Sequence, residues 1–231
     1  MLLECRHIDF RYPGTQDLVF QDLSFRLSEP GFHALFGPSG VGKTSLAKIL
    51  IGEFSVTAGE VRTKGIDRQI LYSYNLERLP GWSSIGRHLE RITPERNQTI
   101  KNDLIEAFGM EDLLNQRFNQ LSLGQQNRIN LIRYLVQDHR VLIMDESLAN
   151  VDEHRRERIL LTIKAMFPQM LFLYISHNLV EVAKFCRMIW VLRSEQYRPR
   201  LITVSGQDYS RTNPLDERAL ENTMLEMMSA R

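Results

Sequence analysis

A glycine-rich segment at residues 37–45 has the residue types and spacing of a phosphate-binding loop. It reads Gly-Pro-Ser-Gly-Val-Gly-Lys-Thr-Ser and matches the pattern G-x-x-x-x-G-K-[ST]. Glycines let backbone N–H groups approach phosphate oxygens closely, and the following helix adds partial positive charge. Lys43 is suited to neutralise the β- and γ-phosphates of a nucleotide, and the Thr44 hydroxyl is suited to Mg²⁺. We therefore expect a set of nucleotide-binding residues in this loop: Gly37, Ser39, Gly40, Val41, Gly42, Lys43, Thr44 and Ser45.

Two acidic residues, Asp145 and Glu146, directly follow the apolar run Val141–Met144. The carboxyl ends of buried parallel strands are where such folds hold their ligands. Asp145 suits a contact with Mg²⁺, directly or through water, and Glu146 suits a residue that holds or deprotonates an attacking water. The alternative is a strand that simply ends in solvated acids, but the phosphate-binding loop upstream favours the functional interpretation.

A third motif lies between these two sites. Residues 121–126 read Leu-Ser-Leu-Gly-Gln-Gln, which resembles the signature sequence Leu-Ser-Gly-Gly-Gln of ATP-binding cassette (ABC) proteins. Other segments resemble that family in the same order along the chain: Tyr12 (the residue that stacks on adenine), Asn75 (the glutamine that links the core to the helical part), Asp145-Glu146 (the end of Walker B), residues 149–152 (the D-loop) and Ser176-His177 (the switch histidine). The resemblance covers roughly residues 3–195.

The chain departs from the family pattern at three places. Leu123 replaces a glycine of the signature, Asn75 replaces the glutamine, and Ser147-Leu148 stands where Pro-Thr is commoner. Asparagine keeps a side-chain carbonyl for Mg²⁺ or water but is one methylene shorter. Leucine at position 123 lacks the conformational freedom of glycine. Ser122 and Gly124, the expected phosphate contacts, remain in place.

The resemblance implies ATP and Mg²⁺ as ligands and assigns roles to individual residues. The expected catalytic residues are Lys43, Glu146 and His177, and the expected Mg²⁺ residues are Thr44, Asn75 and Asp145. The expected ATP contacts are Tyr12, Gly37, residues 39–45, Asn75, Ser122, Gly124 and Gln125. Taken singly, three of these have structural alternatives: packing for Tyr12, a structural hydrogen bond for His177, and a helix N-cap for Ser122. The N-cap role is compatible with phosphate binding, because a capped helix N-terminus also favours anions.

The resemblance further implies a head-to-tail homodimer or pseudo-dimer, in which ATP on Lys43 of one subunit is closed by Ser122 and Gly124 of the other. The resulting cycle would drive transport through a transmembrane permease, with a solute-binding protein acting through that permease. The chain is then expected in the cytoplasm, peripheral on the inner face of the membrane. Leu79–Trp82 resembles importers of small oxyanions and sulfonates.

Two alternatives of other classes stay open. One is an ABC ATPase without a transport role, for example of the cluster-assembly type, with partners that are not membrane proteins. The other is a small-molecule kinase with a phosphate-binding loop. The signature at residues 121–125 and His177 argue against the kinase, because kinases need neither.

Composition restricts the function classes further. The 231 residues include 29 Lys and Arg against 28 Asp and Glu, a net charge of +1, so a nucleic-acid partner is not expected. Cys5 and Cys186 lie far apart without metal-ligand spacing, which favours buried apolar cysteines and a reducing compartment. No secretory signal is apparent, and no apolar stretch approaches the roughly 18 residues of a membrane span.

The strands and helices expected around these residues indicate an α/β fold. We expect a P-loop NTPase core with a mainly parallel sheet, an N-terminal antiparallel β-subdomain and an inserted α-helical subdomain. Alternating apolar residues before position 30 predict antiparallel strands around a Pro13-Gly14 turn. The other expected strands are Phe32–Phe36, Val141–Met144, Leu171–Ile175 and Met188–Leu192, and the expected helices are Thr44–Ile51, Ile100–Phe108, Gln125–Val136, Asp152–Phe167 and Asp216–Met228.

We expect a single ABC nucleotide-binding domain over residues 1–231. Its ATPase core, with the antiparallel part, comprises residues 1–75 and 125–200. Pro80, Gly81 and Pro94 interrupt regular structure where the sequence pattern changes to amphipathic helical stretches, which indicates a helical subdomain at 76–124. Residues 201–231 form a C-terminal tail.

Overall fold

The computed structural model describes residues 1–66, 69–75, 77–79 and 81–230. Two predicted features include residues outside the described ranges. Pro80, expected to interrupt regular structure, is also part of the importer-like segment 79–82, and residue 76 is the expected start of the helical subdomain.

Three antiparallel strands form a small sheet near the N-terminus, in the order β2-β1-β4. They are β1 (Leu2–Phe10), β2 (Phe20–Leu27) and β4 (Ala58–Lys64). The alternation predicted before residue 30 is confirmed, because β2 buries every apolar side chain and exposes the polar ones between them. The second strand begins at Phe20 rather than at Leu18, and β4 was not predicted, because its side chains are almost all exposed and give no apolar pattern.

Six strands form the central sheet, in the order β5-β6-β7-β3-β8-β9. They are β3 (Gly31–Phe36), β5 (Ile70–Tyr74), β6 (Val141–Asp145), β7 (Leu171–Ile175), β8 (Met188–Leu192) and β9 (Leu201–Ser205). The first five are parallel, which confirms the mainly parallel sheet, and β9 is antiparallel to β8. Sequence alternation missed β9, because within this edge strand only Val204 is fully buried. Residues 201–205 therefore belong to the central sheet and not to a separate tail.

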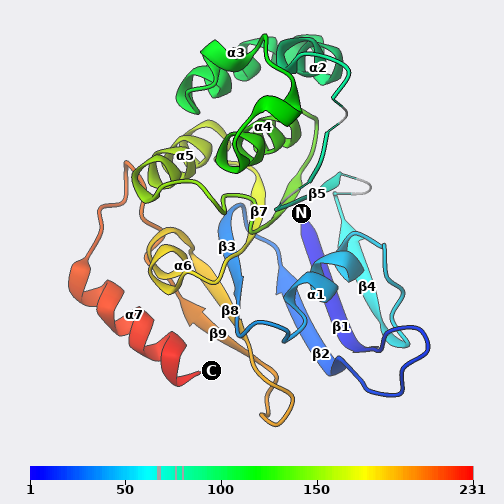
Figure 1. Ribbon diagram of the computed structural model, residues 1–231. Coiled ribbons are helices and arrows are strands. Elements are labelled where there is room, and N and C mark those ends of the chain that lie inside the picture. The colour runs from blue at the N-terminus through cyan, green and yellow to red at the C-terminus, as the bar shows by residue number, and fades with distance from the viewer. Residues whose placement is uncertain (67–68, 76, 80, 231) are drawn as a thin grey trace.

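The central sheet is covered on both faces (Figure 1). Alternate residues of its strands point into two different cores: Val141 and Ile143 pack with α1 (Lys43–Leu50) and the small sheet, whereas Leu142 and Met144 pack with the other helices. That second layer contains α5 (Glu153–Met166), α6 (Leu179–Phe185) and α7 (Glu217–Ser229). Because β6 and β7 are buried on both faces, their continuous apolar runs are explained.

The helical segment forms one end of the molecule, at the top of Figure 1. It contains α2 (Ile85–Ile92) and α3 (Gln98–Ala107), with short 3₁₀ turns at Glu95–Asn97, Glu111–Leu113 and Phe118–Gln120, and α4 (Leu123–Leu135) packs beneath it. The two predicted helices here are confirmed, although each begins two residues earlier than expected. Helices α2 and α6 were not predicted, because each is short and gives only two turns of periodic signal.

Both cysteines are free and buried, Cys5 at 1% and Cys186 at 0% exposure. Burial raises the pKa of the Cys5 thiol to about 12, so that it stays protonated and packs as a small apolar group. The expectation of buried apolar cysteines is confirmed.

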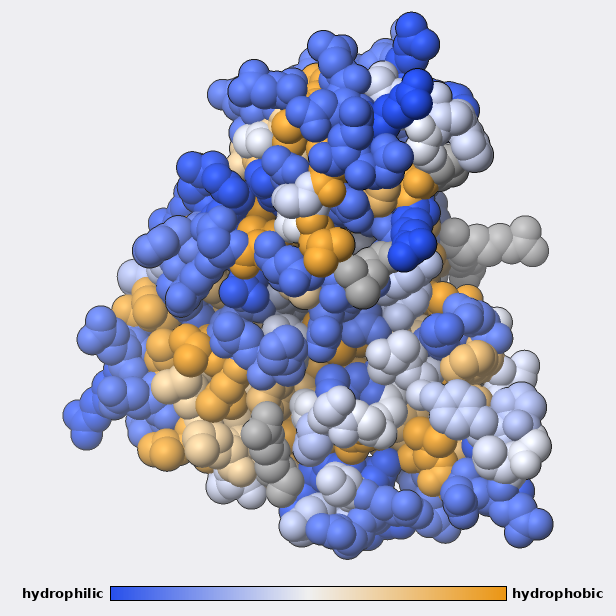
Figure 2. All heavy atoms as spheres, viewed as in Figure 1, coloured by the Kyte–Doolittle hydropathy of each residue, from blue (hydrophilic) through white to orange (hydrophobic). Residues whose placement is uncertain are grey.

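The surface is mostly polar on the face shown in Figure 2, with apolar side chains gathered over α6 and α7. Large apolar side chains exposed on these two helices are Val180, Leu225 and Met228. None of the helices in the described ranges has both the length and the apolar character needed to cross a membrane.

Candidate nucleotide-binding site

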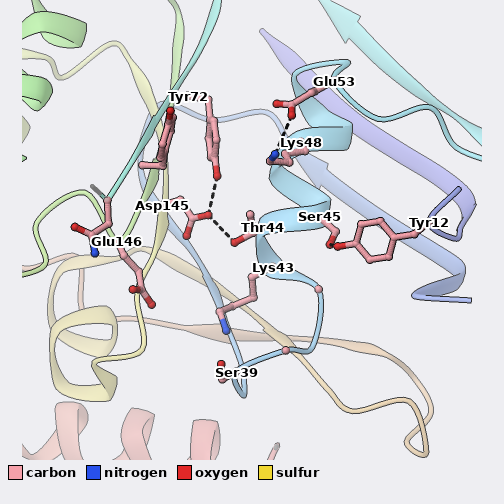
Figure 3. A pocket seen from close by; sticks show the side chains of 14 residues that line it. Tyr12, Ser39, Lys43, Thr44, Ser45, Lys48, Glu53, Tyr72, Asp145 and Glu146 are labelled. Atoms are coloured by element: carbon pink, nitrogen blue, oxygen red, sulfur yellow. Dashed lines mark hydrogen bonds and ion pairs between the residues drawn. The ribbon is translucent and has the colours of Figure 1, made fainter. Parts of the chain in front are cut away.

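A cavity of about 660 Å³ opens where β5 and β6 end and α1 begins (Figure 3). It brings together ten of the predicted site residues: Tyr12, Ser39, Gly40, Gly42, Lys43, Thr44, Ser45, Asn75, Asp145 and Glu146. Four further residues that the sequence did not single out also line it: Lys48, Glu53, Tyr72 and Tyr74. The predicted phosphate loop and the predicted acidic pair therefore face one space.

Sheet topology explains why these segments meet. The loop at 37–45 follows β3, Asn75 follows β5, Asp145 ends β6 with Glu146 next, and His177 lies two residues after β7. All four strands are parallel neighbours, so their carboxyl ends share one edge of the sheet.

The loop at 37–45 requires glycine at two positions for steric reasons. Gly42 has a φ of +110°, and a Cβ atom there would lie 2.8 Å from the Phe20 ring. A Cβ at Gly37 would lie 2.3 Å from the Leu192 carbonyl oxygen. The loop therefore packs tightly against β2 and β8, and this packing holds its backbone in place.

The Lys43 side chain folds back over the beginning of its own loop. Its Nζ donates to the carbonyl oxygens of Gly37 and Pro38, both at 2.8 Å. Phosphate oxygens carry full charge and are stronger acceptors for an ammonium group than carbonyls are. The lysine is therefore held beside the backbone that would cradle a phosphate, with its charge on the cavity side.

Asp145 accepts two hydroxyl hydrogen bonds on one carboxylate oxygen. Thr44 Oγ1 donates to Oδ2 at 2.7 Å, and the Tyr72 hydroxyl donates to the same atom at 2.9 Å (Figure 3). Burial raises the pKa of Asp145, and the two hydroxyl donors partly offset this by stabilising its charged form. Burial and the Asp145 charge raise the pKa of Tyr72, so Tyr72 stays neutral and acts as the donor.

The oxygen atoms of Thr44 and Asp145 fit a magnesium ion. Mg²⁺ prefers oxygen ligands and is usually held by one or two carboxylates together with substrate phosphates. A carboxylate that is nearly fully buried, at 7% exposure, also has the most to gain from a neighbouring cation. Tyr72 was missed because a tyrosine on a strand carries no ligand pattern of its own.

Glu146, which lines the cavity, contacts His177. His177 Nδ1 lies 3.1 Å from Glu146 Oε1, and because a carboxylate only accepts, the imidazole supplies the hydrogen. Glu146 has a φ of +50°, a strained value for a residue other than glycine. Its N–H donates to the Ile175 carbonyl, which ties this backbone to the end of β7. The predicted pair is thus brought together, although only Glu146 lines the cavity.

Asn75 lines the cavity, but its side-chain carbonyl points to α4. Asn75 Oδ1 accepts from Asn127 Nδ2 at 3.0 Å, and the Asn75 N–H donates to the Asp145 carbonyl at 3.1 Å. The predicted role of Asn75 as a Mg²⁺ residue therefore requires its amide to turn away from Asn127.

Tyr12 lies just after β1 and is 42% exposed. Its hydroxyl shares a hydrogen bond of 2.6 Å with Ser45 Oγ. Its ring packs edge-on against Phe10 and Phe54, with centroid distances of 5.3 and 5.9 Å. Tyr12 thus both packs on neighbouring aromatics and lines the cavity.

The signature residues lie outside the set that lines the cavity. Ser122 Oγ accepts from the Gln125 N–H at 3.3 Å, and Gln125 Oε1 accepts from the Ser122 N–H at 2.8 Å. This capping box confirms the N-cap interpretation of Ser122. Val41 and Gly37 also lie outside that set, although their loop neighbours belong to it.

The departure at position 123 has a simple structural explanation. Leu123 is the first residue of α4 and is half exposed, so a leucine fits there without strain. Gly124 is the constrained position, since a Cβ there would lie 2.3 Å from the Asn150 carbonyl oxygen. The close approach of the loop after β6 to α4 therefore depends on Gly124 and not on residue 123.

Comparison with known proteins agrees with this geometry. The family model described as "ABC transporter" matches residues 20–149, more than half of the chain, and the chain belongs to this family. The matched range includes the phosphate loop, the signature and the acidic pair, whereas Tyr12 and His177 lie outside it.

Several curated relatives are ATP-binding proteins of importers. The molybdenum import ATP-binding protein ModC of Saccharophagus degradans is 29% identical, over 78% of this chain and 55% of the relative. ModC of Brucella melitensis is 32% identical, over 78% of this chain and 54% of the relative. The taurine import ATP-binding protein TauB of Pseudomonas fluorescens is 28% identical, over 78% of this chain and 73% of the relative. The chain spans about half the length of the first relatives it matches.

A solved structure shows the same fold. The structure of a bacterial Atm1-family ABC exporter with ATP bound superposes with a TM-score of 0.78, over 99% of this chain and 41% of that one. The two sequences are 19% identical, so this likeness supports the α/β fold.

Proposed function

We propose that this chain binds and hydrolyses ATP as the ATPase subunit of an ABC importer, and that the energy drives transport through a separate permease. The observation that carries the proposal is the single cavity shared by Lys43, Thr44, Asp145 and Glu146. The cavity combines a cation for phosphates, two oxygen ligands for Mg²⁺ and a candidate base. The chain's family and the names of its relatives, which are ATP-binding proteins, support the same function.

The chain's own residues have distinct tasks in this reaction. The loop N–H groups and Lys43 bind the β- and γ-phosphates. Thr44 and Asp145 would hold Mg²⁺, which when bound neutralises charge on the phosphates. Glu146 accepts a proton from the attacking water, whose oxygen bonds to the γ-phosphorus as the bond to ADP breaks. His177, at 3.1 Å, orients the Glu146 carboxylate.

The signature residues support a site shared between two copies of the chain. Ser122 caps α4 with its helix N-terminus exposed, and neither Ser122 nor Gly124 lines the cavity of its own chain. A capped N-terminus favours anions. In a head-to-tail dimer, Ser122 and Gly124 of one chain would close the ATP held by Lys43 of the other.

The relatives support the remaining partners. Their names specify import of molybdenum, taurine or ribose, and these cargoes have little chemistry in common. This diversity favours a substrate chosen by the permease, together with a solute-binding protein, rather than by this chain. The proposed location is the cytoplasmic face of the membrane. The non-transport alternative is not favoured, because the relatives are named as import ATP-binding proteins. The kinase alternative is not favoured, because the chain belongs to the ABC transporter family.

Steady-state phosphate release at increasing chain concentration tests the shared site. Because each site needs two chains, the rate per chain is expected to rise with concentration and then to level off. A rate per chain that is constant at every concentration would contradict the shared site, and the absence of any release would contradict the ATPase.

A mixing experiment serves as the control for this result. Lys43→Ala and Ser122→Arg are each expected to be inactive alone. Their mixture is expected to regain activity, because one of the two sites in a mixed dimer combines an intact Lys43 with an intact Ser122. A mixture as inactive as its components would argue against the head-to-tail arrangement.

A further inference from the structure

One buried amide joins three segments around the cavity. Asn127 on α4 is 2% exposed, and its Nδ2 donates both hydrogens, to Asn75 Oδ1 at 3.0 Å and to the Ala149 carbonyl oxygen at 2.5 Å. Asn75 directly follows β5, and Ala149 belongs to the loop after β6. Asn127 therefore bonds both the segment after β5 and the loop after β6 to α4.

Both partners of Asn127 bond the backbone of the predicted site residues Asp145 and Glu146. The Asn75 N–H donates to the Asp145 carbonyl at 3.1 Å, and the Ala149 N–H donates to the Glu146 carbonyl at 2.9 Å. In the other direction, α4 begins at Leu123 with Ser122 as its N-cap, five residues before Asn127. The amide thus lies between the cavity of this chain and the helix end expected to serve the cavity of a second chain.

We propose that Asn127 is a positioning residue that transmits nucleotide occupancy of the cavity to the N-terminus of α4 in the same chain. This inference rests on the proposed function. The element with two arrangements is the Asn75 amide, whose carbonyl either accepts from Asn127, as here, or turns toward the cavity. Nucleotide and its cation favour the second arrangement, whereas Asn127 favours the first.

Burial makes the response of Asn127 obligatory. A buried N–H that loses its acceptor is costly, so it is almost always paired with another group. When Asn75 turns away, Asn127 therefore has to shift toward a new acceptor while it still holds Ala149. Such a shift moves α4 relative to the loop after β6, and Gly124 is already packed against Asn150 of that loop.

Asn130 provides a matched control on the same helix. It is also 2% exposed, and its Nδ2 donates to the Glu77 carbonyl at 2.8 Å. Asn130 therefore matches Asn127 in residue type, in burial and in donating to a backbone carbonyl. Unlike Asn127, it is not bonded to Asn75 or to the loop after β6 among the described residues.

The test is hydrogen exchange of residues 122–126 in the purified full chain, at concentrations where light scattering shows a monomer. Exchange is compared without nucleotide and with a saturating non-hydrolysable ATP analogue and Mg²⁺, and binding is measured separately by titration. The wild-type chain is expected to change its exchange in this segment on binding. Asn127→Ala is expected to bind the analogue but to lose that change, whereas Asn130→Ala is expected to keep it.

The outcomes separate this inference from the proposed function. A chain that does not bind the analogue would contradict the proposed function. Binding without a change at residues 122–126, a change retained in Asn127→Ala, or an equal loss in Asn130→Ala would each overturn the inference alone. If Asn127→Ala does not fold, Asn75→Ala removes the same bond from the half-buried partner, and a retained change in that variant overturns the inference as well.

Discussion

Glu146→Gln is expected to bind ATP as the wild type does but to release phosphate about 100- to 10,000-fold more slowly, the usual contribution of a positioned general base. The amide is almost the same size as the carboxylate and still contacts His177, but it cannot take a proton from water. Because the Glu146 side chain is 39% exposed and its partner His177 is 76% exposed, the substitution should not lower stability. The effect therefore falls on the chemical step.

Single-turnover phosphate release with saturating ATP, together with equilibrium ATP binding, measures these two effects separately. Glu153→Gln removes an exposed carboxylate that lies outside the cavity lining and should behave as the wild type. Unchanged turnover in Glu146→Gln would remove Glu146 from the role of base. A parallel loss of binding would indicate instead that Glu146 contributes to the shape of the site.

Lys43→Ala is expected to weaken ATP binding by about 3 kcal/mol, close to a 100-fold rise in Kd, the scale observed when one partner of a buried charged pair is removed. Lys43 is the cation that bridges the phosphate loop through Gly37 and Pro38. Without its ammonium group the loop keeps its N–H donors but loses the charge that compensates the β- and γ-phosphates.

Titration with ATP measures this loss, and circular dichroism confirms that the variant is folded. Lys64→Ala removes an exposed lysine of β4 and controls for net charge. Affinity retained in folded Lys43→Ala would contradict the interpretation of residues 37–45 as a phosphate-binding loop.

Local motifs made much of the fold and the cavity predictable. A phosphate loop needs its glycines, lysine and hydroxyl at fixed spacing, so residues 37–45 are recognisable without knowledge of the rest of the chain. The apolar run before Asp145 required a strand buried on both faces, and parallel pairing then brought Asp145 beside Thr44. These inferences depended on short-range patterns or on one rule of sheet topology.

Other features depended on long-range packing and were not predictable. Tyr72 reaches Asp145 only because β5 pairs in register with β6, which no pattern in residues 70–74 reveals. The bond between Asn75 and Asn127 joins positions 52 apart, and β9 is an edge strand that buries little. Leu123 lacks the conformational freedom of the family's glycine, but the steric requirement lies at Gly124, where the Asn150 carbonyl approaches.

The most direct test of the transporter assignment is an affinity pull-down of tagged Glu146→Gln chain with Mg²⁺ and ATP from detergent-solubilised native cells. This variant is expected to hold ATP and therefore to keep its nucleotide-bound complexes intact. Mass spectrometry should identify an integral membrane protein in stoichiometric amount. Recovery of only non-membrane partners, with the solubilised membrane fraction empty, would contradict the account and assign the ATPase to a role outside transport.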